Sequence, residues 1–255
     1  MQEDNQKEIE WLHLIRKIEL DKILHFFPKQ KNEKILEIGG GDGYQSKLIF
    51  ENGYQNISSM DIVSKNTQYF PVQKILNTSN LKTDTFELIF TSHVIPHIKN
   101  LDEMYFEINR ILKTHGLIVH IVPSIWWSII TNFWHYLFLP RTLVNFLSNN
   151  KSSSVIYNQN KENDINKKSM FKKILNYLFL HPLGENPSFI HETYFFSDFY
   201  WKKHFQKQGY KIEKSISGPL IYSGYGIFRN KGMGVRKKFA MIFPSSYCYI
   251  LKKEN

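Results

Sequence analysis

The stretch Lys34-Ile35-Leu36-Glu37-Ile38-Gly39-Gly40-Gly41-Asp42-Gly43 joins a short apolar run to a cluster of four glycines. The apolar run is typical of a buried strand, and the residues from Tyr44 to Asn52 carry apolar side chains at helical spacing. Glycines between a strand and a helix permit a tight turn, and they let a ligand approach the backbone amides at the helix N-terminus. The stretch therefore predicts a strand, a ligand-binding turn and a helix, in that order.

Strands and helices alternate on both sides of this turn. The expected strands are Lys34–Ile38, Asn56–Met60, Val72–Leu76, Phe86–Thr91 and Gly116–Val122, followed late in the chain by an antiparallel edge pair, Tyr210–Ser217 and Tyr225–Arg229. The expected helices are Glu8–Phe27, Tyr44–Asn52, Leu101–Lys113, Ile125–Leu147 and Ser197–Gln208. Alternation at this spacing predicts an α/β fold with a doubly wound, mainly parallel sheet between two layers of helices.

The composition is that of a globular protein. The 255 residues are 42% hydrophobic and 22% charged, which suits one large α/β domain or two small ones. Cys248 is the single cysteine, so disulfides within the chain and sites built from several cysteines are excluded, and no metal is expected. The polar start of the chain lacks a signal-peptide pattern, and polar residues interrupt the uncharged stretch 118–140, so a cytoplasmic protein is expected.

The net charge of +10 belongs to the second part of the chain. Residues 1–150 carry 15 Lys and Arg against 16 Asp and Glu, whereas residues 151–255 carry 18 against 7, which gives net charges of −1 and +11. Basic and apolar residues are mixed near the end: Lys231, Arg236, Lys237, Lys238, Lys252 and Lys253 flank Phe239, Met241, Ile242, Phe243, Tyr247 and Tyr249. Four interpretations stay open: a solvated surface, an anionic acceptor, peripheral contact with a membrane and, least favoured because no RNA-binding motif is found, RNA.

Two familiar classes of ligand fit the glycine turn poorly. A nucleoside triphosphate requires a Gly-Lys-Ser/Thr ending, which Gly43-Tyr44-Gln45 lacks. A dinucleotide requires Gly-x-Gly-x-x-Gly/Ala, of which Gly41-x-Gly43-x-x-Ser46 is only a near match. A third pattern, Glu-x-Gly-x-Gly-x-Gly, is matched in full by Glu37, Gly39, Gly41 and Gly43.

This third pattern resembles the first motif of the class I S-adenosylmethionine-dependent methyltransferases. Their sulfonium cofactor has no phosphate, so an acidic Glu37 at the turn does not repel it, and Asp61 at the end of the second strand can accept both ribose hydroxyls. The resemblance continues through Phe86–Ile98, which is similar to the family's fourth-strand motif, and through Leu101–Val122. Pro96 and Thr114-His115 depart from the Glu and the Pro-Gly that are usual there.

The resemblance implies a Rossmann-like sheet of seven strands with a reversed last hairpin and a helical lid inserted after strand five. It implies S-adenosyl-L-methionine as the cofactor and S-adenosyl-L-homocysteine as its product. The residues expected to bind the cofactor are Glu37, Gly39, Gly41, Gly43, Tyr44, Asp61, Ile62, Asn77, Ser92 and His93, with Asn77 standing where the family often has an Asp.

The whole chain, 1–255, is expected to form a single methyltransferase domain. Its expected parts are an N-terminal helix (1–30), the cofactor-binding core (31–123), the lid or acceptor insertion (124–196) with a mobile loop at about 148–168, and a C-terminal part (197–255) with a helix, edge strands and a basic tail.

Three histidines are candidates for a general base. His93 and His97 flank the end of the fourth strand, next to the expected position of the transferable methyl group, and His191 precedes the helix that begins at Ser197. The expected acceptor is small and either anionic, with a phosphate, or sugar-like, as in O-methylation of a surface-polysaccharide precursor. Two other functions stay open, namely a membrane- or partner-binding protein without turnover on this scaffold, and an RNA methyltransferase.

Overall fold

The computed structural model describes residues 2–62, 69–74, 81–152, 193–224, 226 and 228–253, and for 2–5 and 139–152 it describes the backbone alone. Asn77, His191 and residues 153–168 of the expected loop lie outside the described residues.

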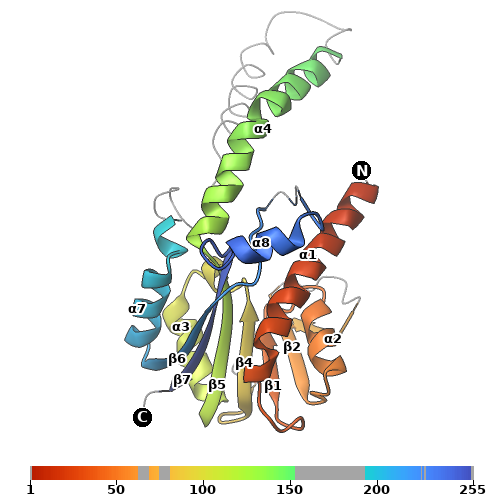
Figure 1. The fold of residues 1–255 in the computed structure, drawn as a ribbon. Helices are drawn as coiled ribbons and strands as arrows, with labels where there is room; N and C mark the ends of the chain where they lie inside the picture. The colour runs from red at the N-terminus through yellow and green to blue at the C-terminus, as the bar shows by residue number, and fades with distance from the viewer. Residues whose placement is uncertain are drawn as a thin grey trace, which may run out of the picture.

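The centre of the fold is a seven-stranded sheet with the strand order β3-β2-β1-β4-β5-β7-β6 (Figure 1). Its strands are β1 (Ile35–Ile38), β2 (Ile57–Asp61), β3 (Val72–Lys74), β4 (Phe86–Ser92), β5 (Leu112–Pro123), β6 (Tyr210–Ser217) and β7 (Ser246–Lys253). The first five strands pair in parallel, whereas β7 is antiparallel to both β5 and β6. The predicted doubly wound sheet with a reversed last strand is therefore confirmed.

Helices cover both faces of this sheet. The helical elements that the structure describes are α1 (Gln2–Ile23), the 3₁₀ turn η1 (Leu24–Phe26), α2 (Tyr44–Glu51), the 3₁₀ turn η3 (Ile95–His97), α3 (Leu101–Ile111), α4 (Ile125–Ser152), α7 (Asp198–Lys207) and α8 (Met233–Phe239). The Ser197 hydroxyl accepts the Tyr200 N–H at 3.1 Å and begins α7, which confirms the predicted cap. The predicted helical insertion after strand five is α4, which rises away from the sheet (Figure 1).

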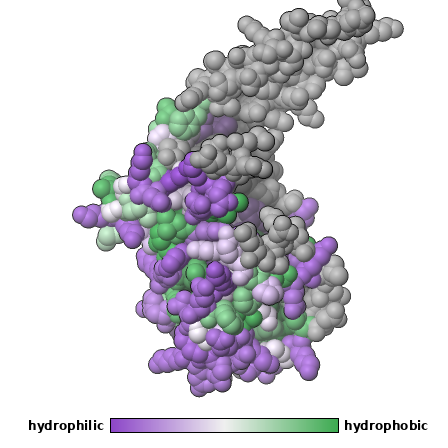
Figure 2. Space-filling view, turned by 90° about the vertical axis from the view of Figure 1, so that its right-hand side faces the viewer, coloured by the Kyte–Doolittle hydropathy of each residue, from purple (hydrophilic) through white to green (hydrophobic). Residues whose placement is uncertain are grey.

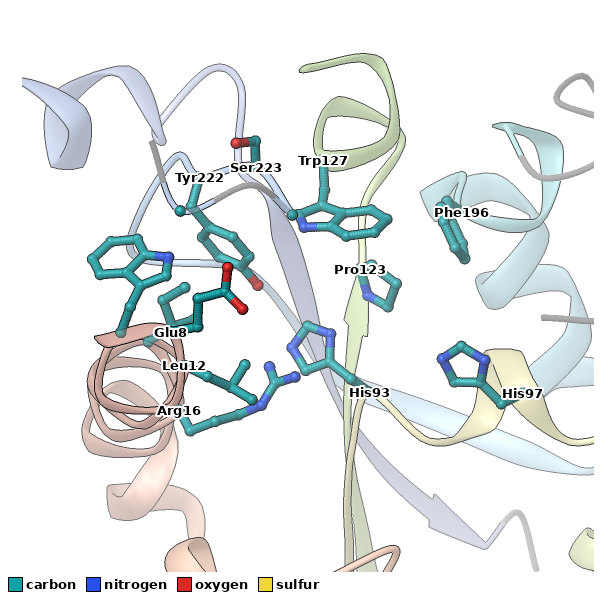
Figure 3. Close-up of a pocket in the computed structure, with 14 residues that line it drawn as sticks. Glu8, Leu12, Arg16, His93, His97, Pro123, Trp127, Phe196, Tyr222 and Ser223 are labelled. Carbon is teal, nitrogen blue, oxygen red and sulfur yellow. The ribbon is translucent and has the colours of Figure 1, made fainter. Parts of the chain in front are cut away.

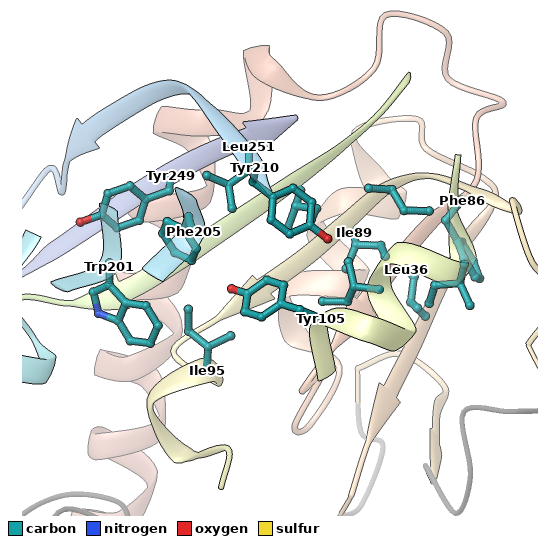
Figure 4. Close-up of a cluster of buried hydrophobic side chains, with 14 of the residues drawn as sticks. Leu36, Phe86, Ile89, Ile95, Tyr105, Trp201, Phe205, Tyr210, Tyr249 and Leu251 are labelled. Atoms are coloured by element: carbon teal, nitrogen blue, oxygen red, sulfur yellow. The ribbon is translucent and has the colours of Figure 1, made fainter. Parts of the chain in front are cut away.

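The apolar side chains of the strands alternate between two cores, because successive residues of a strand point to opposite faces. Ile35 of β1 packs with Leu20 of α1 and Ile49 of α2 on one face. Leu36, the next residue, belongs to the core on the other face, which includes residues of α3 and α7 (Figure 4); the other residues labelled there are Phe86, Ile89, Ile95, Tyr105, Trp201, Phe205, Tyr210, Tyr249 and Leu251. Burial on both sides fixes the register of the sheet and the edge at which its loops emerge.

The prediction of Tyr225–Arg229 as a strand is wrong. The described residues of this segment lie outside any strand, and Gly226 and Arg229 have φ values of +56° and +36°, which an extended chain does not adopt. The partner of β6 is instead β7, which was interpreted as part of a basic tail because of Lys252 and Lys253. Its continuous run of buried residues is typical of a strand covered on both faces.

Among the helices that the structure describes, none has the length and hydropathy needed to cross a membrane.

Candidate active site

The site lies at the carboxyl ends of β1 and β4, where the strand order reverses. The chain continues from β1 to β2 and β3 on one side, and β4 and β5 lie on the other. Ligands of open α/β sheets bind at such a switch point. The register of β1 against β2 and β4 places Gly39, Asp61 and Ser92 side by side at this edge.

The glycine turn depends on left-handed backbone and on close packing. Gly39, Gly41 and Gly43 have φ values of +82°, +57° and +85°, a region that residues with side chains avoid. A Cβ on Gly39 would lie 2.1 Å from Cγ2 of Val94, whereas a Cβ on Gly41 would meet no atom of the described residues within 4 Å. Gly39 is therefore required for packing, and Gly41 borders open space that a ligand can enter.

Asp61 is tied to the turn. Its Oδ2 accepts the Gly41 N–H at 2.9 Å, and the residue stands at the end of β2. Ile62 follows it with 74% of its surface exposed, an apolar side chain available to a ligand. Asp61 and Ile62 therefore border the turn on its β2 side, next to Gly41.

Glu37 does not face the open side of the turn. It is 2% exposed, and its carboxylate accepts hydrogen bonds from the hydroxyls of Ser46 on α2 and Ser59 on β2. Burial raises its pKa more than these two hydrogen bonds lower it. The carboxyl group thus joins β1, β2 and α2 below the turn.

The N-terminal helix packs across the turn. Nε2 of His13 lies 2.7 Å from Oδ2 of Asp42, and the His13 ring stacks on Tyr44 with centroids 3.9 Å apart. Tyr69 meets the same His13 ring edge-on at 4.9 Å. Tyr44 is therefore held by α1.

The residues present fit a sulfonium nucleoside better than a nucleotide. Within the described residues the turn is bordered by carboxylates, those of Asp42 and Asp61, which would repel phosphate. The buried hydroxyl of Ser92, at the end of β4, finds no hydrogen-bond partner among the described residues. A buried polar group of this kind calls for a ligand or a water. Together with the open space over Gly41, these features suit an uncharged ribose and a positively charged sulfur.

A buried carboxylate organises the other half of the site. Glu19 of α1 is 2% exposed, and among the described residues its carboxylate contacts Arg16 (3.1 Å), His93 (3.1 Å), Tyr222 (2.9 Å) and Ser246 (2.5 Å). Burial alone would raise the pKa of Glu19, but the charge and hydrogen bond of His93 and the charge of Arg16 outweigh it and lower the pKa to about 2. Glu19 is therefore ionised at neutral pH.

This carboxylate fixes the tautomer of His93. An ionised carboxylate only accepts hydrogen bonds, so Nε2 of His93 carries the hydrogen and donates it to Glu19, which leaves Nδ1 with a free lone pair when the ring is neutral. Burial and the charge of Arg16 lower the His93 pKa more than Glu19 raises it. The residue also holds a φ of +57°, uncommon for a side chain of this size.

His93 borders a cavity of about 400 Å³ between α1, the start of α4 and the segment around Tyr222. In Figure 3 its ring lies between Arg16 and Pro123, with Trp127 above it and His97 further along the wall. Apolar and aromatic side chains make most of the lining, and the polar ones are Glu8, Arg16, His93, His97 and Ser223. A cavity of this size and lining suits a small molecule.

The structure thus brings together most of the predicted residues that it describes. Gly39, Gly41, Gly43, Tyr44, Asp61, Ile62, Ser92 and His93 border the edge of the sheet, Glu37 lies beneath it, and His97 lies across the cavity from α1. Sequence reasoning missed Arg16, Glu19, Tyr222 and Ser246. The one available signal for Glu19 was an acidic residue beside Ile18 and Leu20 in the apolar half of the first helix.

The family to which these features belong is shown by comparison. Residues 10–152, more than half of the chain, match the model of a family described as methyltransferase domain, so the chain belongs to that family. This confirms the resemblance inferred from the glycine turn. No curated protein matches the sequence.

Solved structures share the fold at low identity. An S-adenosylmethionine-dependent methyltransferase from Mesorhizobium loti is 10% identical with a TM-score of 0.52, covering 92% of this chain and 98% of its own. A possible histamine N-methyltransferase from Thermotoga maritima is 13% identical at 0.52, covering 97% and 95%. A geranyl diphosphate methyltransferase in complex with S-adenosylmethionine is 10% identical at 0.50, covering 94% and 85%.

The protein is accordingly a methyltransferase of this family, and it shares its fold with S-adenosylmethionine-dependent methyltransferases. One of these structures holds S-adenosylmethionine, the cofactor that the glycine turn of this chain predicts.

Proposed function

We propose that the protein methylates a hydroxyl group of a small, sugar-like acceptor bound in the cavity beside His93. The observation that carries this proposal is the Glu19–His93 pair: a buried, ionised carboxylate holds an imidazole at the cavity wall with its Nδ1 lone pair free. A neutral imidazole of this kind is suited to take a proton from a hydroxyl.

The cavity lining supports an acceptor with both polar and apolar surface. Trp127 and Phe196 offer ring faces on which the C–H face of a sugar ring can lie, and Glu8 and Ser223 offer hydrogen-bonding groups. Arg16 is the basic side chain of the lining, and Glu19 already engages it. A sugar from a surface-polysaccharide precursor fits this lining, and the positive charge of Arg16 can attract the phosphate group of a phosphorylated sugar.

Cofactor binding is proposed for the turn and its neighbours. Asp61 holds the ribose, Gly41 allows close approach of the backbone, and Ile62, Ser92 and Tyr44 complete the contacts. When bound, S-adenosylmethionine supplies a methyl group on a positively charged sulfur, which keeps the bonding electrons as the acceptor oxygen takes the methyl.

The side chains around the cavity remove the proton from the acceptor and exclude water. Nδ1 of His93 takes the hydroxyl proton, Glu19 keeps the ring in the required tautomer and stabilises the resulting imidazolium, and the aromatic walls exclude water. Trp127, at the start of α4, belongs to the wall, so the insertion after β5 acts as a lid on the acceptor.

The test is transfer of a labelled methyl group to a panel of hexoses and hexose phosphates, with His93→Asn compared to His97→Asn. Asn tolerates the positive φ of position 93. We expect His93→Asn to lower kcat by about 10²-fold or more, a typical loss for a general base, and His97→Asn to change mainly KM. Calorimetric binding of S-adenosylhomocysteine should stay unchanged in both variants, and should weaken strongly in Asp61→Ala.

The pH dependence supplies a second readout. Because the His93 pKa lies below 6.5, kcat should be flat at neutral pH and fall as the pH drops through that lowered pKa. Glu19 raises the His93 pKa, so Glu19→Gln should move the acid limb to lower pH. Full kcat in His93→Asn, or an acid limb that Glu19→Gln does not move, would contradict the assignment of the base.

A further inference from the structure

The segment 228–243 combines basic and apolar residues without any acidic one. Its sequence is Phe228-Arg229-Asn230-Lys231-Gly232-Met233-Gly234-Val235-Arg236-Lys237-Lys238-Phe239-Ala240-Met241-Ile242-Phe243, and it contains α8. The stretch 125–138 at the start of α4 carries neither acidic nor basic residues apart from His135. These two stretches are therefore free of the carboxylates that would repel an anionic surface.

The apolar residues of this segment are turned outward. Val235 is 59% exposed, Phe239 52%, Met241 81% and Ile242 69%, although such residues are usually buried. Lys231, Lys237 and Lys238 are exposed among them. We call these seven residues the α8 surface. Figure 2 shows hydrophobic side chains at the molecular surface directly beside hydrophilic ones.

Two other basic residues near the end of the chain, Arg236 and Lys253, make contacts within the fold. Arg236 donates to the carbonyls of Ile221 (2.9 Å) and Arg229 (2.5 Å), and its guanidinium lies 4.9 Å from the centroid of the Trp11 ring. Lys253 donates to the carbonyl of Asn109 at 2.7 Å. Arg236 thus anchors α8 to α1, while the α8 surface faces outward from a fixed base.

The base of α4 adds to the apolar area at the same end of the molecule. Ile129 is 39% exposed and Phe133 60%, and α4 rises from the end of the sheet across which α8 lies (Figure 1). A second cavity, of about 190 Å³, is lined by Ile130 and Trp134 of α4 and by Arg236 of α8. It shares Trp11 and Tyr222 with the active-site cavity, so the site adjoins this end.

We propose that the α8 surface docks the enzyme onto an anionic lipid bilayer. Apolar side chains interleaved with lysines are the composition of segments that lie in a membrane interface, where the apolar groups enter the acyl boundary and the lysines meet anionic headgroups. Charge complementarity favours this occupant, because five basic residues and no acidic one lie in 228–243. A neutral protein groove would not require the lysines. Asp21 of α1 borders one flank of the surface, beside Lys237 and Met241.

The experiment is flotation of the full-length protein with vesicles of phosphatidylcholine alone and with about one third phosphatidylglycerol added, at low and high salt. We expect partitioning onto the anionic vesicles that falls at high salt, and little onto the neutral ones. Lys237→Glu/Lys238→Glu removes two positive charges and adds two negative ones, so it should reduce the partition coefficient by more than roughly thirtyfold. Met241→Ser/Ile242→Ser should reduce it by about tenfold or more.

Matched controls lie on the opposite face of the sheet. Lys203→Glu/Lys207→Glu changes the net charge equally on exposed positions of α7, and Phe199→Ser removes an exposed aromatic residue there. Both controls should float like the unchanged protein, and S-adenosylhomocysteine binding should be equal in all variants, which shows that they are folded and separates this test from the choice of acceptor. Equal losses in the controls, absence of flotation of the unchanged protein, or binding of an RNA oligonucleotide through the same lysines without flotation would overturn the proposal.

Discussion

Two glycines of the same turn make a matched pair at the scale of single residues. Gly39→Ala places a Cβ 2.1 Å from Val94 in the left-handed region, so we expect the variant to be destabilised by about 3 kcal/mol or more, or not to fold. Gly41→Ala meets open space, so strain of about 1 kcal/mol is expected. Urea unfolding measures both stabilities.

Cofactor binding distinguishes the proposed role of Gly41 from the packing role of Gly39. Because the space over Gly41 is proposed to hold the cofactor, Gly41→Ala should weaken S-adenosylhomocysteine binding by more than its small loss of stability explains. Calorimetric titration of this folded variant decides the point, and unchanged affinity would show that the open space beside Gly41 is not used.

His120 gives the stability a pH dependence. Its ring is fully buried and bonds to Thr91 (2.7 Å) and to the Tyr105 hydroxyl (3.2 Å), and burial, aided by the charge of His204, lowers its pKa from 6.5 to about 3. Below pH 6.5, His120 binds a proton in the unfolded chain but stays neutral in the folded one. The free energy of unfolding should therefore fall as the pH drops from 6.5 toward 3, by up to about 1.4 kcal/mol per pH unit.

The matching variant is His120→Gln. It should be less stable at pH 7, because a buried polar pair is disturbed, yet lose less of its Tm between pH 7 and pH 5 than the unchanged protein. An equal pH slope in both proteins, measured by thermal unfolding, would assign the acid sensitivity to other groups such as His93.

At the scale of elements, the glycine turn and the strand ends beside it were predictable because their signals are local. A glycine turn after an apolar run, and Asp61 and Ser92 at strand ends, are visible within short windows of the chain. The Glu19 network is not, since its partners Tyr222 and Ser246 lie 203 and 227 residues away. Polar residues on a helix are usually solvated, so α1 gave little indication that it enters the site.

Residues 225–229 were predicted as the strand beside β6 in place of β7, and this error has a similar cause. Both segments are rich in apolar and aromatic residues, and the choice between them depends on backbone conformation at Gly226 and Arg229 and on pairing with the distant β5. Local propensity does not encode such pairing. The lysines of β7 suggested a tail because their contacts, such as that of Lys253 with Asn109, come from another part of the fold.

For the whole molecule, the charge asymmetry separates two tasks. The near-neutral first part of the chain holds the glycine turn, Asp61 and the Glu19–His93 pair. The excess of positive charge lies in the second part, where the α8 surface stands beside the acceptor cavity. The proposed cofactor site and the proposed docking surface therefore lie in different parts of the chain, which meet at one end of the sheet.

The insertion of β7 between β5 and β6 also bears on the order in which the chain folds. Ser124 bonds to the Pro244 carbonyl across 120 residues, so the pairing of β5 with β7 closes a long loop, and pairings of such high sequence separation form slowly. Doubling the length of that loop would cost only about 0.6 kcal/mol more in loop-closure entropy. The long insertion therefore slows folding more than it destabilises the folded protein.

Cys248 makes this order measurable. The thiol is buried in β7, and burial raises its pKa, which makes it inert in the folded protein. During refolding, pulses of a thiol reagent should label Cys248 until a late phase, after helical circular dichroism has recovered. Protection that appears together with the helices would mean that the last strand joins the sheet early.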